Sequence, residues 1–501
     1  MNALSFHACV ALATLALISL SISPASFAQH VEDPRRIADQ GLHELIAGLQ
    51  SDDHAERSRS ALALRRLGPE AAEAVPALVA ALDDWDSPNR AHAIKALGGI
   101  GPAGVPALLA ILPGDSEYDR SFAALALREV HTCSEQSREA LIAALAHPSD
   151  FVRPLAAIAH WRATGDSSLA LPVLHQEMAN RDNPAANYIV FALMEFDTES
   201  VLRVKQPLSS IANWNRERQT RRVATNALNA LLAARPETVF EPFDDSGIEG
   251  GFEVHRCNGV PPHPIGEFPN HACPSEFRLQ AYEFRSPVKG MHAMEAPFAA
   301  PAEIPVGASH MFGISNAGIP FDSSLDRWWR NDPNSGWRYN VVARREEFGL
   351  DEHHGYIHAD GAYRYHGQPR WVRKLDDRFG GMGLVGISAD GFFIFNGMGH
   401  EDPHDRGSRV RKLRSSYQLK KGNRPEPPLG PGGPHDGTFI EDYEYVAGSG
   451  DLDRCNGREG VHRRFLVDGK LSYNYHITED FPYVPLYFHS QPDESFRRPG
   501  E

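Results

Sequence analysis

The sequence predicts a multidomain protein in which an all-α solenoid is followed by a mainly β, loop-rich domain. Three observations lead to this prediction. The chain has 501 residues, which is too long for one ordinary hydrophobic core. A helical motif recurs at nearly constant spacing through the first half. From about Gly250 onward, glycine, proline, aromatic residues and histidine become frequent and the long helical periodicity disappears.

Residues 1–29 have the composition of a secretory signal peptide. They contain no charged side chain when His7 is counted as neutral, and Ala8–Leu20 is an apolar run too short to span a membrane stably. Ser26-Phe27-Ala28 is a cleavage-type pattern of small residues. No later segment is apolar enough to cross a bilayer, so we expect a secreted or periplasmic protein without a transmembrane segment.

Residues 30–235 are expected to form stacked helix pairs. An arginine followed by small or apolar residues three and six positions later recurs, and successive arginines are spaced by 33, 30, 33 and 68 residues. The spacing of 68 is two steps of 34, and Asn187 holds the position between them. Such a helix pair cannot bury its apolar face alone, so the units must stack into a solenoid. The arginines are Arg57, Arg90, Arg120, Arg153 and Arg221.

The segments between these helices repeat as well. Gly68-Pro69 precedes Val75-Pro76-Ala77-Leu78, and Gly101-Pro102 precedes Val105-Pro106-Ala107-Leu108. Proline is tolerated in the first turn of a helix, where its missing N–H has no partner in any case. With these features the region resembles HEAT repeats of the short bacterial kind. The resemblance implies a surface for a protein partner rather than chemistry.

We expect a linker at residues 236–250, a second domain at 251–494 and a frayed tail at 495–501. Short alternating or apolar runs such as Gly383–Phe395 and Phe439–Val446 predict strands. The net charge of −15 argues against general nucleic-acid binding.

Histidine and tyrosine are concentrated in residues 351–367. Tyr363 and Tyr365 alternate with Arg364 and His366, which is strand spacing, so the two tyrosines share one face of a strand and the other two share the opposite face. Imidazoles that converge from a strand and the loop before it can form a transition-metal site. A histidine-rich surface hairpin explains the same residues, and both interpretations stay open.

The second domain resembles the YHYH domain family over nearly its whole length. The resemblance implies a domain type and no particular reaction. The motifs that carry it are Cys257–Pro261 with His263, Gly266–Asn270, Phe312–Phe321, Asn331–Tyr339, Gly361–Pro369, Leu384–Ile394, Asp436–Tyr445, Gly450–Gly457 and Phe481–Tyr483.

The sequence departs from the motif that names this family. It has Tyr363-Arg364-Tyr365-His366, so arginine stands where the family has its first histidine, and arginine cannot lose its proton to become a ligand. Of the candidate metal ligands, His358 and His366 remain, with help from His354 or His400. A histidine site favours Cu or Zn over Mg or Ca. Either the site has been rebuilt in this protein or it no longer binds metal.

Cysteines and acidic residues give two further predictions. Export makes disulfides possible, and Cys257 and Cys273 are the closest pair in sequence, so we predict a bridge between them. Asp451 and Asp453 place two carboxylates on one side of a strand or turn, as a Ca²⁺ site requires. Acids that are solvated or paired with arginine explain the same pattern.

A basic run at residues 406–424 is a candidate surface for an anionic glycan or membrane phosphate, although a solvated loop explains it too. Aromatic side chains in the second domain could stack on sugar faces or pack in the core. These aromatic residues are Trp328, Trp329, Trp337, Tyr339 and Trp371.

Three functional hypotheses follow. The favoured one is a secreted module that binds a metal or an extracellular ligand without turnover, with the solenoid as an interaction scaffold. The second is a metal-dependent enzyme that acts on an extracellular polymer, with Asp390 or Asp360 as the base. The third is a structural envelope or adhesion module. The sequence contains no Gly-x-Ser-x-Gly motif and no papain-type cysteine, which favours binding over nucleophilic catalysis.

Overall fold

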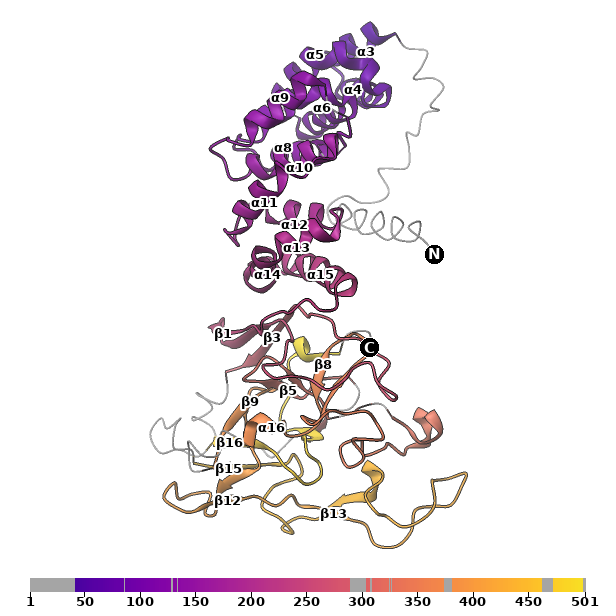
Figure 1. The fold of residues 1–501 in the computed structure, drawn as a ribbon, viewed down its shortest axis with the longest axis vertical. Coiled ribbons are helices and arrows are strands. Elements are labelled where there is room, and N and C mark those ends of the chain that lie inside the picture. Colours follow the sequence, from indigo (N-terminus) through magenta and orange to yellow (C-terminus); the bar gives the residue numbers. More distant parts are fainter. Residues whose placement is uncertain are drawn as a thin grey trace. The chain divides into compact units, whose positions relative to one another are not determined.

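The computed structural model describes residues 41–498 except Trp85, Arg128, Cys133, Ser324, Asp326 and the segments 289–302, 307–308, 374–380 and 462–471. The predicted signal peptide lies outside the described residues, as does Cys133. The chain divides into two compact units, Met1–Leu174 and His175–Glu501. In the described part, helices occupy the first half and strands the second (Figure 1), which confirms the predicted fold class.

The first unit consists of short helices that follow the predicted repeats. Proline lies in the first turn of α5, α6 and α7, in the repeated Val-Pro segments of α5 and α7 and in Ser87-Pro88 of α6. Alanine and leucine fill the space between the helices, and Leu64, Leu78 and Ile94 are fully buried. The elements are α3 (Leu42–Gly48), α4 (His54–Leu67), η2 (Gly68–Ala74), α5 (Val75–Ala80), η3 (Ala81–Asp83), α6 (Ser87–Ile100), η4 (Pro102–Gly104), α7 (Val105–Ile111), α8 (Glu117–Leu127), α9 (Glu135–Ala144), α10 (Val152–Thr164) and α11 (Ala170–Met178), the last of which continues into the second unit.

The recurring arginines have a common structural role. Four of the five bind the turn that leads into their own helix, since Nη1 donates to a backbone carbonyl six residues earlier. A guanidinium satisfies carbonyl groups that the turn would otherwise leave without partners. At 2.7–2.8 Å the pairs are Arg57 with Ser51, Arg90 with Asp84, Arg153 with His147 and Arg221 with Asn215.

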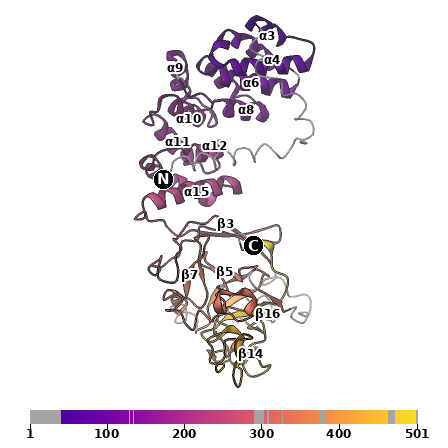
Figure 2. The same ribbon diagram turned by 90° about the vertical axis from the view of Figure 1, so that its right-hand side faces the viewer.

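The second unit contains helices as well as the β domain. These helices are α12 (Ala186–Leu193), α13 (Thr198–Arg203), α14 (Lys205–Trp214) and α15 (Arg218–Ala234). Figures 1 and 2 both show α15 beside β3. Asn229 of α15 exchanges two hydrogen bonds of 2.8 and 2.9 Å with the backbone of Leu279. Arg221, with a side chain 2% exposed, forms an ion pair with Glu283 of β3. The last repeat therefore packs directly on the β domain.

Strand pairing defines the β domain. An antiparallel sheet has the order β1-β2-β3, and an eight-stranded mixed sheet has the order β15-β16-β10-β9-β5-β6-β8-β7. Three two-stranded sheets, β11-β12, β13-β14 and β17-β4, complete it. The strands are β1 (Asp244–Glu249), β2 (Phe252–Cys257), β3 (Tyr282–Pro287), β4 (Ile304–Pro305), β5 (Gly313–Ser315), β6 (Pro320–Phe321), β7 (Gly355–Ile357), β8 (Tyr363–Tyr365), β9 (Leu384–Ser388), β10 (Phe393–Asn396), β11 (Met398–His400), β12 (Val410–Lys412), β13 (Tyr417–Leu419), β14 (Tyr443–Tyr445), β15 (Gly457–Gly460), β16 (Ser472–Ile477) and β17 (Tyr487–Phe488).

Short helices interrupt the strands. They are η5 (Trp329–Asn331), η6 (Pro333–Ser335), α16 (Arg370–Arg373), η7 (Ile440–Asp442) and η8 (Glu494–Phe496). Within the part of the chain that is described, no helix has both the length and the apolar character needed to cross a membrane.

Two predicted boundaries are wrong. Residues 244–249 of the expected linker form β1, because their backbone pairs with β2 in antiparallel register. Part of the expected frayed tail is ordered within the core. Phe496 is fully buried and stacks on Phe284 with ring centroids 4.5 Å apart, and Arg498 pairs with buried Asp322.

The predicted disulfide is also wrong. Cys257, Cys273 and Cys455, the cysteines among the described residues, are free and buried. Cys257 ends β2, whereas Cys273 lies against β7 and its Sγ donates to the carbonyl of Ile357 at 3.2 Å. Closeness in sequence suggested the bridge, but the chain between the two cysteines leads them to different strands.

Candidate functional site

The β7–β8 hairpin carries the residues that the sequence singled out. β8 pairs antiparallel with β7 and lies parallel to β6, where Phe321 is opposite Tyr365. Gly361 turns the chain between the two strands with a φ of +79°, a conformation that glycine adopts without steric cost. Gly355 is required for another reason. A Cβ there would lie 1.9 Å from the hydroxyl oxygen of Tyr363.

The predicted division of β8 into two faces is confirmed. On the first face, the hydroxyl of Tyr363 donates to Asp351 at 2.6 Å, and the hydroxyl of Tyr365 lies 2.6 Å from Nε2 of His263. On the second face, Nε2 of His366 lies 3.1 Å from Nε2 of His358. The alternation of the strand thus places Tyr363 and Tyr365 on one face and His366 on the other.

The two imidazoles of the second face are held neutral. Burial lowers the pKa of His366 to about 4. Burial also lowers the pKa of His358 well below its ordinary value, and the nearby Arg364 lowers it further. His366 is 3% exposed, while His358 is only partly buried. Both rings are therefore neutral at neutral pH, and one Nε2 donates its hydrogen to the other.

A buried charge cluster lies beside this pair. Asp322 is fully buried and binds Arg364 through one carboxylate oxygen, at 3.2 Å, and Arg498 through the other. Arg364 also pairs with Asp360. Burial alone would raise the pKa of Asp322, but Arg498, the His358–His366 pair and Arg364 hold it at about 2. Two carboxylates and two guanidinium groups make the cluster close to neutral in total.

The other predicted ligands are not gathered into one site with this pair. Nδ1 of His354 lies 3.0 Å from the carbonyl oxygen of Gln368, and Nδ1 of His400 lies 3.1 Å from that of Ser408. In the described part of the chain, no three His, Cys, Asp or Glu side chains are close enough together to hold a metal ion. Of the predicted ligands, His358 and His366 are thus the pair in direct contact.

The proposed bases have structural partners. Asp390 is fully buried, where Ser388 donates to it at 2.6 Å and Tyr475 at 2.7 Å. Asp360 holds Arg364.

The acidic segment and the basic run satisfy each other. Both oxygens of Asp451 accept from Arg411 at 2.8 Å, and buried Asp442 binds Arg424 at 2.6 and 2.7 Å. Asp453 accepts from Tyr473 at 2.9 Å. Both Asp451 and Asp453 thus have protein partners, and calcium binding at these residues stays a prediction.

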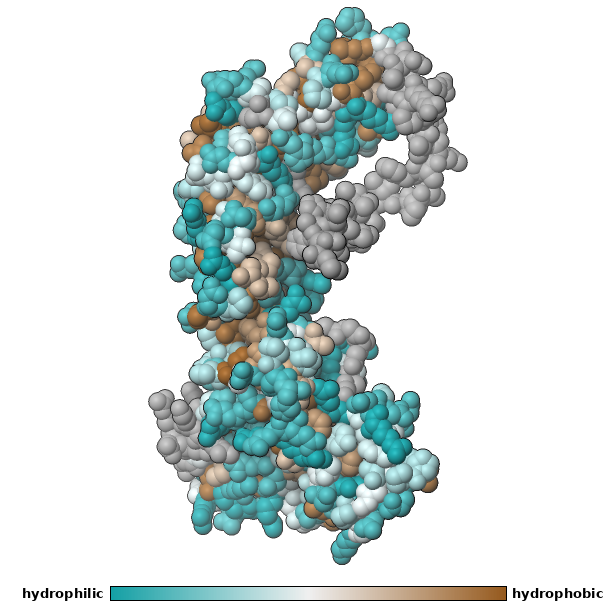
Figure 3. All heavy atoms as spheres, turned by 45° about the vertical axis from the view of Figure 1, so that its right-hand side comes forward, coloured by the Kyte–Doolittle hydropathy of each residue, from teal (hydrophilic) through white to brown (hydrophobic). Residues whose placement is uncertain are grey.

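The surface of the β domain is largely polar. The face in Figure 3 is mostly hydrophilic there, with scattered apolar residues. Trp328 and Trp329 are half-buried, and arginine covers each ring: Arg338 lies 5.6 Å and Arg330 4.4 Å from the respective ring centroid. Part of this aromatic surface is therefore already packed.

Sequence reasoning missed several residues of the site. Asp322, Arg498 and Trp371 were not assigned to it, and His263 was noted only as part of a motif. Asp322 and Arg498 are 176 residues apart, and His263 and Tyr365 are 102 residues apart, so no local spacing connects them. The available signal was the clustering of acidic and basic residues in separate motifs, which does not identify partners.

The comparisons agree with the two-part architecture. The family model described as YHYH protein matches residues 291–489, and the model described as HEAT repeats matches residues 42–112. The chain thus carries a YHYH domain behind N-terminal HEAT repeats. None of the curated proteins matches the chain.

Solved structures match the helical region. A HEAT-like repeats protein from Thermococcus onnurineus is 14% identical with a TM-score of 0.28, over 38% of this chain and 87% of that chain. The CpcE–CpcF complex of phycocyanin lyase from Nostoc is 21% identical with a TM-score of 0.22, over 42% and 92%. A designed armadillo repeat protein is 18% identical with a TM-score of 0.23, over 38% and 100%. With TM-scores this low, these matches add nothing to the argument.

Proposed function

We propose that this protein is exported, that its YHYH domain binds copper or zinc through His358 and His366, and that its HEAT repeats bind a protein partner. The observation that carries the metal proposal is the pair of neutral imidazoles with Nε2 atoms 3.1 Å apart. An ion placed about 2.0–2.1 Å from both nitrogens would subtend an angle of about 100°, which suits a tetrahedral or tetragonal site.

The charge of the cluster limits the affinity. Arg364 disfavours protonation of His358, and by the same repulsion it disfavours a metal cation. Asp322 attracts cations, but two guanidinium groups already compensate its charge. Two imidazoles supply only part of a coordination shell, so solvent or a ligand completes it. We therefore expect weak binding, in the range of an exchangeable rather than a structural metal.

Metal titration tests this proposal. The mature full-length protein, purified without an affinity tag, is loaded with Cu or Zn, and its metal content and affinity are measured. His366→Ala and His358→Ala should each lower the affinity at least tenfold, since each removes one of two ligands. His404→Ala, at an exposed histidine, is the matched control and should change nothing. Equal affinity in all four proteins would remove the proposal.

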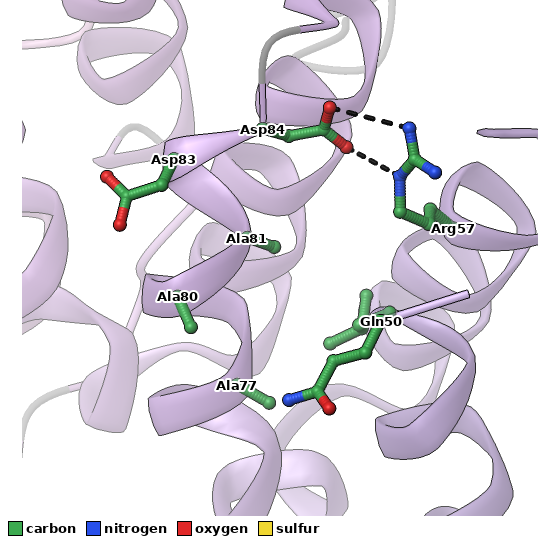
Figure 4. Close-up of a pocket in the computed structure, with 8 residues that line it drawn as sticks. Gln50, Arg57, Ala77, Ala80, Ala81, Asp83 and Asp84 are labelled. Atoms are coloured by element: carbon green, nitrogen blue, oxygen red, sulfur yellow. Dashed lines mark hydrogen bonds and ion pairs between the residues drawn. The ribbon is translucent and has the colours of Figure 1, made fainter. Parts of the chain in front are cut away.

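The HEAT repeats offer a place for a protein partner. A hollow of about 350 Å³ lies where α3, α4 and α5 meet, and small side chains, Ala77, Ala80 and Ala81, line it (Figure 4). Arg57 and Asp84 form an ion pair at its edge, 2.6 Å apart. Ala80→Arg in the full chain should weaken capture of a periplasmic or cell-surface partner by crosslinking, whereas Glu139→Arg on exposed α9 should not. Identical crosslinks from both variants would remove this surface.

Export rests on the composition of residues 1–29, and cell fractionation of the chain with and without these residues tests it directly.

The half-buried tryptophans support at most a supplementary glycan contact, since arginine side chains cover both Trp328 and Trp329. Equal migration of the protein on gels with and without an embedded glycan would remove that contact.

A further inference from the structure

Tyr365 lies at the centre of a chain of hydrogen bonds on the face of β8 opposite the His358–His366 pair. Its hydroxyl oxygen is 3.1 Å from Nε1 of Trp371 and 2.6 Å from Nε2 of His263. Nδ1 of His263 is in turn 2.9 Å from the carbonyl oxygen of Pro264. The proposed metal ligands, His358 and His366, take no part in these hydrogen bonds.

The chemistry of each group fixes where the hydrogens are. The indole nitrogen of Trp371 is a donor only, so Tyr365 accepts from it. The carbonyl of Pro264 is an acceptor only, so Nδ1 of His263 carries a hydrogen. In the neutral imidazole Nε2 is then an acceptor, and the hydroxyl of Tyr365 donates to it. The chain runs from Trp371 through Tyr365 and His263 to Pro264.

Because Tyr365 is buried, the hydrogen bond from its hydroxyl to His263 decides how the phenol can be oxidised. Tyr365 is fully buried, and the interior disfavours a charged phenolate or a charged oxidised phenol. A buried phenol therefore gives up an electron readily only if its proton leaves in the same step. A base with a free lone pair must already be in hydrogen-bond contact, and Nε2 of His263 meets this requirement at 2.6 Å.

We propose that Tyr365 is a redox-active tyrosine with His263 as its proton acceptor. A one-electron oxidant, of the class of oxidised transition-metal complexes, takes one electron from Tyr365 and is itself reduced by one electron. The Oη–H bond breaks, the proton moves to Nε2 of His263, and a neutral phenoxyl radical and an imidazolium result. Return of one electron and of the same proton restores Tyr365.

The surroundings suit both products. Trp371 is partly exposed, and its indole N–H donates a hydrogen bond to the phenolic oxygen of Tyr365. The indole therefore connects the buried ring with the surface. The imidazole of His353 stacks on His263 with centroids 3.6 Å apart and planes inclined by 13°. That contact holds the His263 ring in place while its charge changes.

Other buried tyrosines differ in their acceptors. Tyr363 donates to Asp351, Tyr473 to Asp453 and Tyr475 to Asp390. In each of these the acceptor is a carboxylate, whereas Tyr365 donates to an imidazole nitrogen. Tyr363 lies on the same strand and the same face as Tyr365, 5.6 Å away between ring centroids, and is therefore the matched control.

Flash photolysis tests the proposal on the metal-free full-length chain, with a photogenerated ruthenium(III) polypyridyl complex as the oxidant. Transient absorption and electron paramagnetic resonance report the phenoxyl radical. Tyr365→Phe should lose at least three-quarters of the signal, and Tyr363→Phe should keep it. His263→Gln should slow radical formation at least tenfold and reduce its hydrogen–deuterium isotope effect.

A wild-type signal that survives unchanged in Tyr365→Phe overturns the proposal. Should Tyr365→Phe fail to fold, as circular dichroism would reveal, His263→Gln decides the question, and an unchanged rate and isotope effect then overturn it. Since neither copper nor zinc is added to the protein, the result is independent of the copper or zinc proposal.

Discussion

Asp322 is expected to be the residue on which the charge cluster depends, and Asp322→Asn removes its charge with almost no change of shape. Each carboxylate oxygen holds one guanidinium, that of Arg364 or that of Arg498. Breaking one side of a buried ion pair costs about 3–5 kcal/mol, because a charge is left uncompensated in the interior. Arg364 keeps Asp360 as a partner, so we place the expected loss at the lower end, about 3 kcal/mol.

The pKa of Asp322 gives a second estimate of the same quantity. It falls from 3.8 to about 2 in the folded protein. At about 1.4 kcal/mol per pKa unit, the shift corresponds to about 2–3 kcal/mol of stability at neutral pH. The folded-state pKa is depressed, so this contribution is present above pH 3.8 and is lost as the pH falls toward 2. The stability difference between wild type and Asp322→Asn should shrink over the same interval.

Urea denaturation at several pH values, read through hydrogen exchange of peptides that cover residues 355–367, measures this difference locally. Glu346→Gln is the control, since the side chain of Glu346 is 91% exposed, and its stability should lie within about 0.5 kcal/mol of wild type. A difference for Asp322→Asn below about 0.5 kcal/mol at pH 7, or one that does not change between pH 5 and pH 3, would refute the reasoning.

Three further predictions concern neighbouring contacts. Arg364→His should raise copper or zinc affinity at least tenfold and lower stability by about 3 kcal/mol, since it replaces a buried cation with a metal ligand. Metal titration measures the affinity and thermal melts measure the stability. Unchanged affinity would contradict the expected gain in metal binding. A double-mutant cycle of Arg221→Ala and Glu283→Gln should give a coupling energy of about 1–3 kcal/mol, and a value near zero would mean that this ion pair does not hold α15 on β3. Phe496→Ala should cost about 3–5 kcal/mol in denaturant unfolding because the ring is fully buried, whereas a cost below about 1 kcal/mol would support the frayed tail.

Local patterns predicted the local structure well. The arginine spacing identified the helices α4, α6, α8, α10 and α15, because each repeat sets its own helix start and its own core positions. The alternation of residues 363–366 predicted which side chains share a face of β8, because a strand fixes this geometry whatever its neighbours. Such predictions need only the period of the backbone.

Contacts between distant segments were not predictable in the same way. The proximity of Cys257 and Cys273 in sequence suggested a disulfide, but strand pairing leads the two residues to different places. Two histidines of the predicted metal set bind backbone carbonyls of nearby turns instead. Partner choice of this kind depends on the packing order of strands, which a single sequence does not encode in any spacing.

Arginine at position 364 changes the charge balance of the hairpin relative to a hairpin with histidine there. With histidine in that position, Asp322 and Asp360 would face fewer buried cations, and a metal ion could compensate their charge. With arginine, the guanidinium compensates both carboxylates permanently and leaves His358 and His366 as neutral neighbours. The charges of the cluster are thus balanced by the protein's own side chains.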